Sequence, residues 1–245
     1  MTVLLIDRGN TRTKWQLHES NDMITRGVSA NDESLESIFS GLTKQSLSGV
    51  YVASVVGESF EKELSQWAEK NNWPSPVFIR SEKQAFGVSN AYAKPTDLGV
   101  DRWLTLVAVH QSHTGLVCIV DCGTAFTIDF VNADGRHLGG FILPGINLMK
   151  SSLLNNTDNI KVAGEDEQVL LGTSTSQAVA LAPAQALAAF AQKKMQQVES
   201  DTGAVAQIVL TGGESNLLED LLGLDCHLEQ DLVLKGLYLY AQKNP

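Results

Sequence analysis

The chain has 245 residues, of which 43% are hydrophobic and 19% are charged, proportions that are typical of a soluble globular protein. Its length is enough for one large domain or two smaller ones, each with a buried core. The formal net charge of −10 argues against nonspecific binding to nucleic acid or to an anionic membrane, because both attract basic surfaces. The charge still allows a bound nucleotide, whose phosphates can be held locally by backbone amides and one or two cations.

The cysteine content indicates a reducing compartment. Cys118, Cys122 and Cys226 form no CxxC pair, so neither a zinc site nor a disulfide framework is predicted. The N-terminus enters a strand almost at once, without a basic leader, and no apolar window is long enough to span a membrane. We therefore expect a cytoplasmic protein.

The first stretch, residues 3–15, is an apolar strand followed by a turn of small, polar and charged residues. The strand ends at Asp7, and Gly9, two hydroxyl residues and Lys14 follow. The carboxylate can bind Mg²⁺, the glycine lets the backbone approach a ligand, and the lysine supplies a point charge. This combination suits a metal-bound polyphosphate, and an ordinary strand with a hairpin turn is the alternative.

Strands and helices alternate over the rest of the first hundred residues. Strand patterns occur at residues 13–17, 23–28, 49–55 and 76–79. Helical patterns occur at residues 33–42, where Asn31 or Asp32 can cap the helix, and at residues 58–71. Residues 84–98 read as irregular. The order predicts an α/β domain with a mixed sheet.

An acidic residue and a basic residue open the next predicted helix, within residues 99–110. Asp101 and Arg102 lie in its first turn, ahead of an apolar run. The helix dipole favours an acid at this end, so Asp101 can be a capping residue. Alternatively, a side chain on this turn can project into a cleft while the body of the helix stays packed.

Residues 115–129 repeat the pattern of the first stretch. A buried strand again ends in Asp-x-Gly, here Asp121 to Gly123, and a small polar residue and a second strand follow. A repeat at half-chain spacing predicts two related domains, and two facing turns can hold a nucleotide phosphate tail and its metal from both sides. Coincidence is the alternative, because Asp-Gly turns are common.

The last hundred residues contain glycine turns and a long alanine-rich helix. Gly139-Gly140 and Pro144-Gly145 mark a strand that enters a helix, and residues 155–164 are polar and expected to be exposed. The helix over residues 177–198 contains Pro183, which should either kink it or begin a second helix. A strand over 205–211 leads to Gly212-Gly213, a loop beside a nucleotide or an ordinary turn, and helices are expected at 215–222 and 231–241.

Taken together and in this order, the motifs at residues 7–14, 99–102, 121–124, 139–145 and 212–213 resemble the type III pantothenate kinase, or Bvg accessory factor, family. This family lies in the acetate and sugar kinase and actin superfamily. The resemblance implies an α/β fold of two duplicated ribonuclease-H-like (actin-like ATPase) domains, residues 1–113 and 114–245, with mixed sheets around a central cleft. It implies ATP-dependent phosphorylation of pantothenate to 4′-phosphopantothenate, the first step of coenzyme A biosynthesis. It also implies a homodimer, Mg²⁺ and a monovalent cation, K⁺ or NH₄⁺.

The same resemblance implies roles for single residues. Asp101 would be the proton acceptor, Asp121 would bind the monovalent cation, and Asp7 would help to organise the metal. The implied ATP contacts are Asp7, Arg8, Gly9, Asn10, Thr11, Arg12, Thr13, Lys14 and Thr124. The implied pantothenate contacts are Tyr92, Gly99, Val100, Asp101, Arg102 and Thr175. Arg8 departs from the family pattern, in which a smaller or uncharged residue is usual, so it either touches phosphate or points to solvent. Pro183 also departs, because relatives commonly continue a helix there through small residues.

Two other functions are compatible with the motifs. One is a kinase for another small hydroxylated substrate, and the other is a non-catalytic nucleotide-binding regulator. The acidic net charge argues against a regulator that binds DNA directly.

Overall fold

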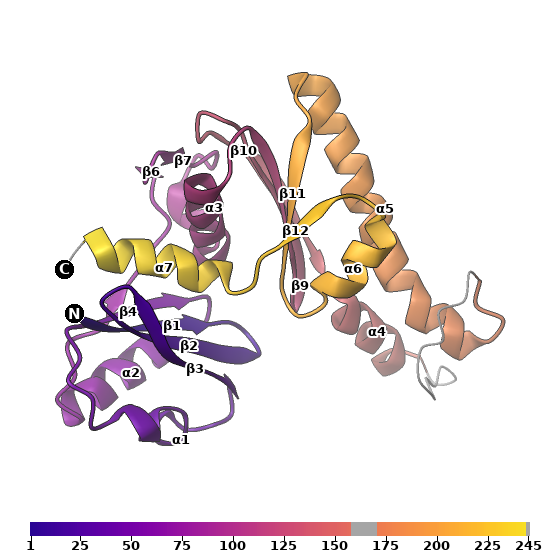
Figure 1. Ribbon diagram of the computed structural model, residues 1–245. Coiled ribbons are helices and arrows are strands. Elements are labelled where there is room, and N and C mark those ends of the chain that lie inside the picture. The colour runs from indigo at the N-terminus through magenta and orange to yellow at the C-terminus, as the bar shows by residue number, and fades with distance from the viewer. Residues whose placement is uncertain (158–170, 244–245) are drawn as a thin grey trace. The chain divides into compact units, whose positions relative to one another are not determined.

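The computed structural model describes residues 1–157 and 171–243. The chain forms two compact units, one of Met1–Ser112 with Asp231–Pro245 and the other of His113–Gln230. Each unit contains a five-stranded mixed sheet with helices packed on it (Figure 1). The part of the predicted exposed segment at residues 158–164 lies outside the described residues.

The first unit is built on a sheet with the strand order β3-β2-β1-β4-β5. Its strands are β1 (Thr2–Arg8), β2 (Arg12–Glu19), β3 (Asp22–Ala30), β4 (Gly49–Ser54) and β5 (Val77–Phe78). The first three strands are antiparallel neighbours, and β4 and β5 continue the sheet in parallel with β1. Its helices are α1 (Leu35–Phe39), α2 (Glu58–Lys70), α3 (Val100–Ser112) and α7 (Leu232–Lys243), with short 3₁₀ turns η1 (Ser40–Leu42) and η2 (Pro95–Asp97).

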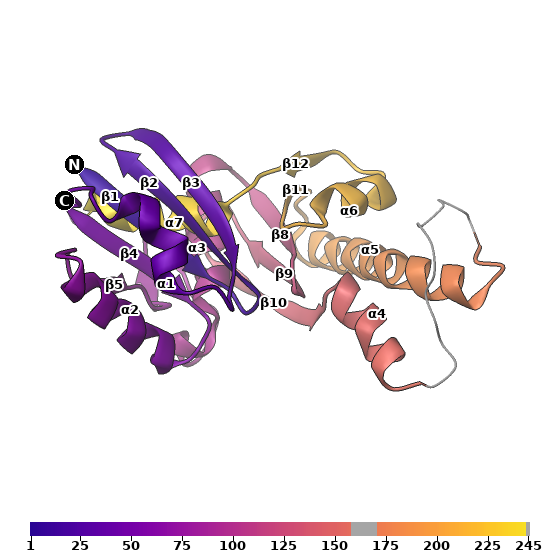
Figure 2. The same cartoon turned by 90° about the horizontal axis from the view of Figure 1, so that it is seen from below.

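Helices cover both faces of this sheet, which explains the uninterrupted apolar run of β1. Leu4 and Ile6 pack with α1, α2 and Trp73 in one core. Val3 and Leu5 point to the opposite face, because side chains alternate along a strand, and both are buried. Helices α3 and α7 pack on each other, and α7 contacts β1 and β4 (Figure 2).

The second unit repeats this topology with the strand order β10-β9-β8-β11-β12. Its strands are β8 (Leu116–Cys122), β9 (Ala125–Val131), β10 (His137–Pro144), β11 (Ala206–Thr211) and β12 (Cys226–Leu228). Three antiparallel strands are again followed by two parallel ones. Its helices are α4 (Ile146–Asn155), α5 (Thr175–Thr202) and α6 (Ser215–Leu222), and residues of all three join the core beneath β8.

Asp7 and Asp121 occupy the same place in the two units. Each is the penultimate residue of the central strand, β1 or β8, immediately before a hairpin to the next strand. The prediction of two duplicated α/β units with mixed sheets is therefore confirmed.

The C-terminal helix differs from its expected place. The predicted domain of residues 114–245 grouped it with the second half of the chain, whereas it belongs to the first compact unit. Gly236 permits this packing, because a Cβ atom there would collide with the carbonyl oxygen of Leu104 on α3. The close contact between the backbones of α7 and α3 joins segments that are far apart in the sequence, so dividing the sequence into two halves does not predict it.

Three local predictions also need correction. The helix expected at 33–42 is a short α-helix and a 3₁₀ turn, and its cap is Ser34, whose hydroxyl accepts a hydrogen bond from the Ser37 amide. Residues 84–98 contain the small hairpin β6 (Gln84–Ala85) and β7 (Val88–Ser89) as well as η2. The alternative in which Pro183 begins a second helix is wrong, because α5 continues through this buried residue, and the alternative of a kink at Pro183 stays a prediction.

Among the residues that the structure describes, no helix combines the length and the apolar character needed to cross a membrane.

Candidate functional site

The turn between β1 and β2 carries most of the residues expected to contact ATP. The amide of Gly9 donates to the carbonyl oxygen of Arg12 at 3.1 Å, which closes a tight turn with an exposed tip. Asp7 and Lys14 are directly opposed in the hairpin, so both side chains lie on the same face of the sheet. The turn thus places a carboxylate and an ammonium group beside exposed backbone.

Arg8 is turned into the fold, an orientation that the sequence did not suggest. Its guanidinium donates to the Thr13 hydroxyl at 2.6 Å and to the carbonyl oxygen of Asn31 at 3.1 Å. It also lies over the ring of Phe60, 4.6 Å from the centroid. Burial lowers the pKa of this guanidinium, and the charge of Glu63 opposes that shift. Arg8 therefore supports the turn from inside the unit.

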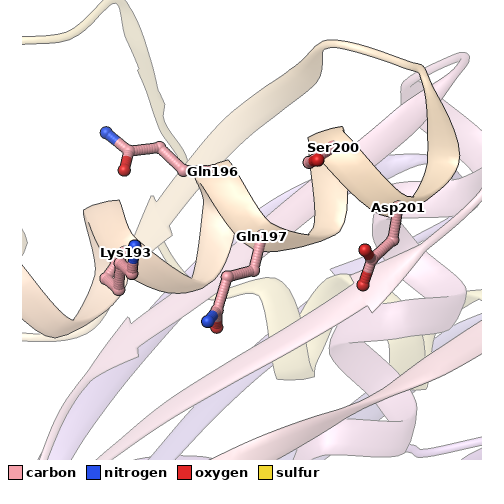
Figure 3. Close-up of a pocket in the computed structure, with 5 residues that line it drawn as sticks. All are labelled: Lys193, Gln196, Gln197, Ser200 and Asp201. Atoms are coloured by element: carbon pink, nitrogen blue, oxygen red, sulfur yellow. The ribbon is translucent and has the colours of Figure 1, made fainter.

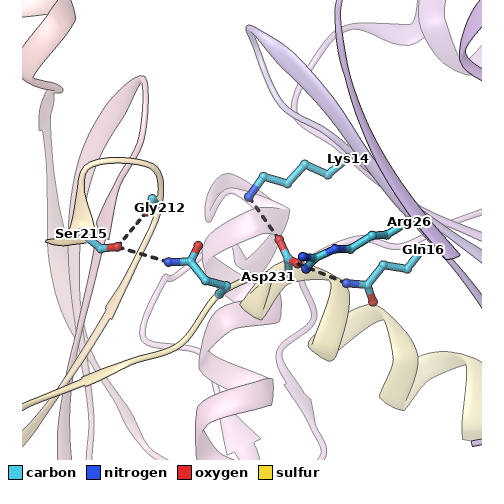
Figure 4. A network of polar contacts seen from close by, with 7 residues as sticks. Lys14, Gln16, Arg26, Gly212, Ser215 and Asp231 are labelled. Carbon is cyan, nitrogen blue, oxygen red and sulfur yellow. Dashed lines mark hydrogen bonds and ion pairs between the residues drawn. The ribbon is translucent and has the colours of Figure 1, made fainter. Parts of the chain in front are cut away.

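Lys14 has an acidic partner at the beginning of α7. Its Nζ lies 3.3 Å from Oδ1 of Asp231, while the side-chain amide of Gln16 and the guanidinium of Arg26 reach Oδ2 at 3.2 and 3.5 Å (Figure 4). Asp231 is mostly buried and adopts a left-handed backbone conformation, with φ of 58°. Asp231 thereby fixes the position of Lys14 through a charge-assisted contact.

All the residues expected to bind pantothenate except Thr175 lie at or beside the first turn of α3. The Arg102 side chain is buried and donates to the Tyr92 hydroxyl at 3.0 Å, and its Cζ lies 5.8 Å from the centroid of the tyrosine ring. Oδ1 of Asp101 accepts a hydrogen bond from the Arg102 amide at 2.8 Å. The carboxylate lies so close to Gly99 that a Cβ atom there would be 2.5 Å from Oδ1.

In the second unit, the turn between β8 and β9 holds Asp121 and Thr124. The amide of Gly145 donates to the carbonyl oxygen of Thr124 at 3.0 Å, which joins this turn to the start of α4. Gly212 closes the other side, because a Cβ atom there would lie 2.5 Å from both Oδ1 of Asp121 and the backbone of Cys122. The glycine at 212 is therefore required by packing around Asp121.

The Gly-Gly loop after β11 is also tied to its own helix. The Ser215 hydroxyl donates to the carbonyl oxygen of Gly212 at 2.9 Å and accepts from the side chain of Gln230 at 3.3 Å (Figure 4). The Gly212-Gly213 loop is thus a strand-to-helix turn, and Gly212 in this turn packs against Asp121.

Thr175 is the exposed first residue of α5. The preceding Ser174 caps the helix by accepting a hydrogen bond from the Gln177 amide at 3.2 Å, and Oε1 of Gln177 accepts from the amide and the hydroxyl of Thr173. The Thr175 hydroxyl is therefore held at a well-defined helix start.

The available oxygen ligands suit hard cations. Within residues 1–157 and 171–243, no three His, Cys, Asp or Glu side chains gather as a metal-binding group. Mg²⁺ is commonly held by one or two carboxylates together with substrate phosphates, and Asp7 and Asp121 each offer one carboxylate in their own unit. Gly212 leaves the space beside Asp121 clear, because a Cβ atom there would lie 2.5 Å from Oδ1 of that carboxylate.

A surface depression along α5 has a different character. It is lined by Lys193, Gln196, Gln197, Ser200 and Asp201, all exposed and all from one helix (Figure 3). None of these is a predicted site residue, and the depression lacks the buried polar groups of a specific site.

Two residues that support the site, Asn31 and Asp231, could not be assigned to it from the sequence. Asn31 contacts the first turn from 22 residues away, and Asp231 contacts Lys14 from 217 residues away. The sequence predicts for Asn31 only a possible helix cap. Neither contact can be inferred from the residues next to Asn31 or Asp231 in the sequence.

Duplicated mixed sheets, each with an aspartate at the end of its central strand, define an actin-like ATPase fold. Solved structures of other proteins share this fold, among them the following two. A conserved Baf family protein from Campylobacter jejuni has a TM-score of 0.60 and 21% identity, with 99% of this chain and 98% of that one covered. The activator of 2-hydroxyisocaproyl-CoA dehydratase from Clostridium difficile, solved with bound ADPNP, has a TM-score of 0.53 and 12% identity, with 100% and 98% covered.

Sequence similarity narrows this class to one family. Residues 3–197 match the family model described as type III pantothenate kinase. The type III pantothenate kinase of Nitrosococcus oceani is 35% identical over 249 residues, which cover 98% of this chain and 94% of that protein. The chain belongs to the type III pantothenate kinase family, which uses ATP to phosphorylate pantothenate in coenzyme A biosynthesis. The family predicted from the motifs is confirmed.

Proposed function

We infer that this chain transfers the γ-phosphoryl group of ATP to pantothenate and releases 4′-phosphopantothenate and ADP. The observation that carries this inference is family similarity over nearly the whole chain. The placement of Asp101 on the first turn of α3, beside the Arg102–Tyr92 pair, supports it.

The chemical step requires mainly positioning and charge neutralisation. Asp101 accepts the proton of the pantothenate primary hydroxyl as the hydroxyl oxygen attacks the γ-phosphorus. A new oxygen–phosphorus bond forms, the bond between the γ-phosphorus and the β,γ-bridging oxygen breaks, and ADP leaves. Arg102, held by the hydroxyl and ring of Tyr92, orients the substrate or balances the charge that develops during transfer.

The phosphates of ATP are assigned to the residues of the two hairpin turns. The exposed backbone at residues 9–12 approaches the phosphates, Lys14 supplies positive charge, and Thr124 adds a contact from the second turn. Asp7 and Asp121 would hold the cations, with the monovalent ion assigned to Asp121. Bound Mg²⁺ supplies positive charge that stabilises the phosphates during transfer. Arg8 supports ATP binding by stabilising the turn and does not contact the phosphates itself, because its guanidinium is hydrogen-bonded to Thr13 and Asn31.

The remaining assignments concern the substrate and the assembly. Gly99, Val100 and Thr175 are proposed to contact pantothenate, with Thr175 presented by the start of α5. A homodimer in the cytoplasm is the proposed form of the enzyme.

A coupled assay of ADP release tests this function. We expect ADP formation only when pantothenate is present, with a higher rate in K⁺ or NH₄⁺ than in Na⁺ at equal ionic strength. Mass spectrometry of the product should show a single phosphate added to pantothenate. ADP release that is independent of pantothenate, or that requires another hydroxylated acceptor, would contradict the assignment.

A further inference from the structure

Asn31, which follows β3, makes an unusually complete set of contacts with the first turn. Its side-chain amide donates to the carbonyl oxygen of Gly9 at 2.7 Å, and its backbone amide donates to the carbonyl oxygen of Thr11 at 3.2 Å. Its side-chain oxygen accepts from the Thr13 hydroxyl at 3.0 Å. Its backbone carbonyl oxygen accepts from Arg8. One residue thus engages four residues of the turn and its flanking strands.

Arg8 and Thr13 close this arrangement into a ring of hydrogen bonds. Thr13 is fully buried, and its hydroxyl accepts from Arg8 while it donates to Asn31. Arg8 is held in turn against the ring of Phe60 on α2. The turn is therefore anchored to the body of the first unit, and Asn31 is the member that touches its carbonyl groups.

The two bonds to carbonyl oxygens have a consequence for an anionic ligand. Carbonyl lone pairs repel phosphate oxygens, whereas backbone N–H groups attract them. The side-chain amide nitrogen of Asn31 donates to the carbonyl oxygen of Gly9, and its backbone N–H donates to that of Thr11. These oxygens are fixed toward Asn31, which keeps them from turning toward a bound phosphate.

We propose that Asn31 is a positioning residue for the ATP phosphates, acting through the backbone of residues 9–11. The proposal rests on the proposed function, in which this turn binds ATP. The role needs a carboxamide, because the side chain must donate to Gly9 and accept from Thr13 at the same time. Aspartate retains the acceptor but places a second oxygen against the Gly9 carbonyl.

The test compares ATP binding by Asn31→Ala and Asn31→Asp with that of the wild type. Isothermal titration with ATP and Mg²⁺ in the absence of pantothenate gives the dissociation constant directly. Asn31→Ala loses two side-chain hydrogen bonds, so we expect about tenfold weaker ATP binding. Asn31→Asp should weaken binding at least as much. The KM for ATP should rise in both variants, while the KM for pantothenate changes by less than about twofold, on the order of measurement scatter.

Asn71→Ala is the matched control. Its side-chain amide donates to the carbonyl oxygen of Trp67 at 2.8 Å at the end of α2, in the same unit, so the variant also loses a side-chain-to-backbone hydrogen bond. We expect it to lower the melting temperature without changing ATP affinity. If Asn31→Ala does not fold, Asn31→Asp, which keeps the bond from Thr13, carries the comparison.

The outcomes separate the inference from the proposed reaction. Wild-type ATP affinity in a folded Asn31→Asp protein would overturn the positioning role. Equal rises in the KM for ATP and for pantothenate would also overturn it, because that result indicates a general structural effect. ATP binding without pantothenate-dependent ADP release in the wild type would refute the proposed reaction and leave the Asn31 result valid. A wild-type protein that does not bind ATP would refute both.

Discussion

Asp101 is the residue on which the proposed chemistry depends most directly. We expect Asp101→Asn to reduce kcat by about 10²–10⁴-fold, since an amide cannot accept the substrate proton. ATP affinity and the melting temperature should be nearly unchanged, because asparagine keeps the oxygen that accepts from the Arg102 amide. Steady-state kinetics combined with calorimetric ATP titration measures both. Turnover close to that of the wild type would exclude Asp101 as the general base.

Gly99 controls where the Asp101 carboxylate lies. An added Cβ atom would be 2.5 Å from Oδ1, so Gly99→Ala must displace the carboxylate. The backbone at Gly99 is not in the left-handed region, so alanine is otherwise allowed there. We expect kcat to fall by about 10–100-fold, as misplacement of a catalytic group by roughly 1 Å is costly.

Gly41→Ala is the control for this change. A Cβ atom at Gly41 meets no atom within 4 Å, so the variant adds the same methyl group without a collision. Kinetics and thermal melting of the two variants should separate a local effect on Asp101 from a general effect of alanine. Equal kcat values for both would show that the Asp101 carboxylate tolerates the displacement.

The sequence predicts those site residues that lie close together both in the sequence and in the fold. Asp7, Gly9 and Lys14 belong to one hairpin, so their proximity follows from the turn itself. Asn31 could be recognised only as a possible cap, and Ser34 takes that place because its hydroxyl reaches the Ser37 amide. Arg8 could not be oriented from the sequence, since Phe60 and Asn31 come from distant segments.

At the scale of elements, a chain of hydrogen bonds connects α3, α7 and the segment before β6. The indole N–H of Trp103 donates to the Tyr240 hydroxyl at 2.9 Å, and that hydroxyl donates to Glu82. Trp103 is fully buried, and burial together with the bond to Glu82 raises the pKa of Tyr240. This chain fixes the helix whose first turn carries Asp101.

Removal of the Tyr240 hydroxyl should therefore destabilise the first unit. We expect Tyr240→Phe to lower the free energy of unfolding by about 1–3 kcal/mol, because the buried indole N–H loses its acceptor. Tyr238→Phe is the control, since its hydroxyl bonds the carbonyl oxygen of Ser20 in an exposed setting. Urea denaturation measures both variants. A loss for Tyr240→Phe no greater than that for Tyr238→Phe would show that this chain of hydrogen bonds contributes little.

The elements themselves followed well from sequence where burial decides the pattern. β1, β4 and β8 are covered on both faces, so each reads as a short apolar run with β-branched residues. Pro183 could not be placed by propensity alone. An interior proline costs roughly 3 kcal/mol, and the packing of Leu187, Ala191 and other α5 residues in the second core favours a continuous helix.

For the whole molecule, the repeat at half-chain spacing was the decisive signal. Matching Asp-x-Gly turns predict two related units, and the two sheets do share one strand order. The membership of α7 in the first unit was not predictable, because it depends on the fit of Gly236 against the α3 backbone. Local sequence patterns thus predict the repeated sheet topology, whereas long-range packing decides which unit contains α7.

The cysteines, which are free thiols, contribute to the pH dependence of global stability at alkaline pH. Burial, with smaller effects of Asp121 and Glu214, raises the pKa of Cys122 from 9.0 to about 12. Burial likewise raises the pKa of the more accessible Cys226 to about 11. In the unfolded chain these thiols ionise near pH 9, so between pH 9 and 12 the unfolded state binds fewer protons than the folded state. The contribution of these two thiols to stability is then fully present below pH 9 and is lost as the pH rises toward 12.

Cys122→Ala should flatten this alkaline loss. The alanine variant lacks the titrating thiol, so its free energy of unfolding should fall less steeply above pH 9, by at most about 1.4 kcal/mol per pH unit. Its stability at pH 7 should be lower than that of the wild type, because a buried side chain has been shortened. Guanidinium chloride denaturation at pH 7, 9, 10 and 11 gives the slopes, and Cys226→Ala, with its smaller pKa shift, should flatten the curve less. Parallel curves for the wild type and Cys122→Ala would show that Cys122 ionises at the same pH in the folded and unfolded chains, which would contradict the effect of burial beside Asp121.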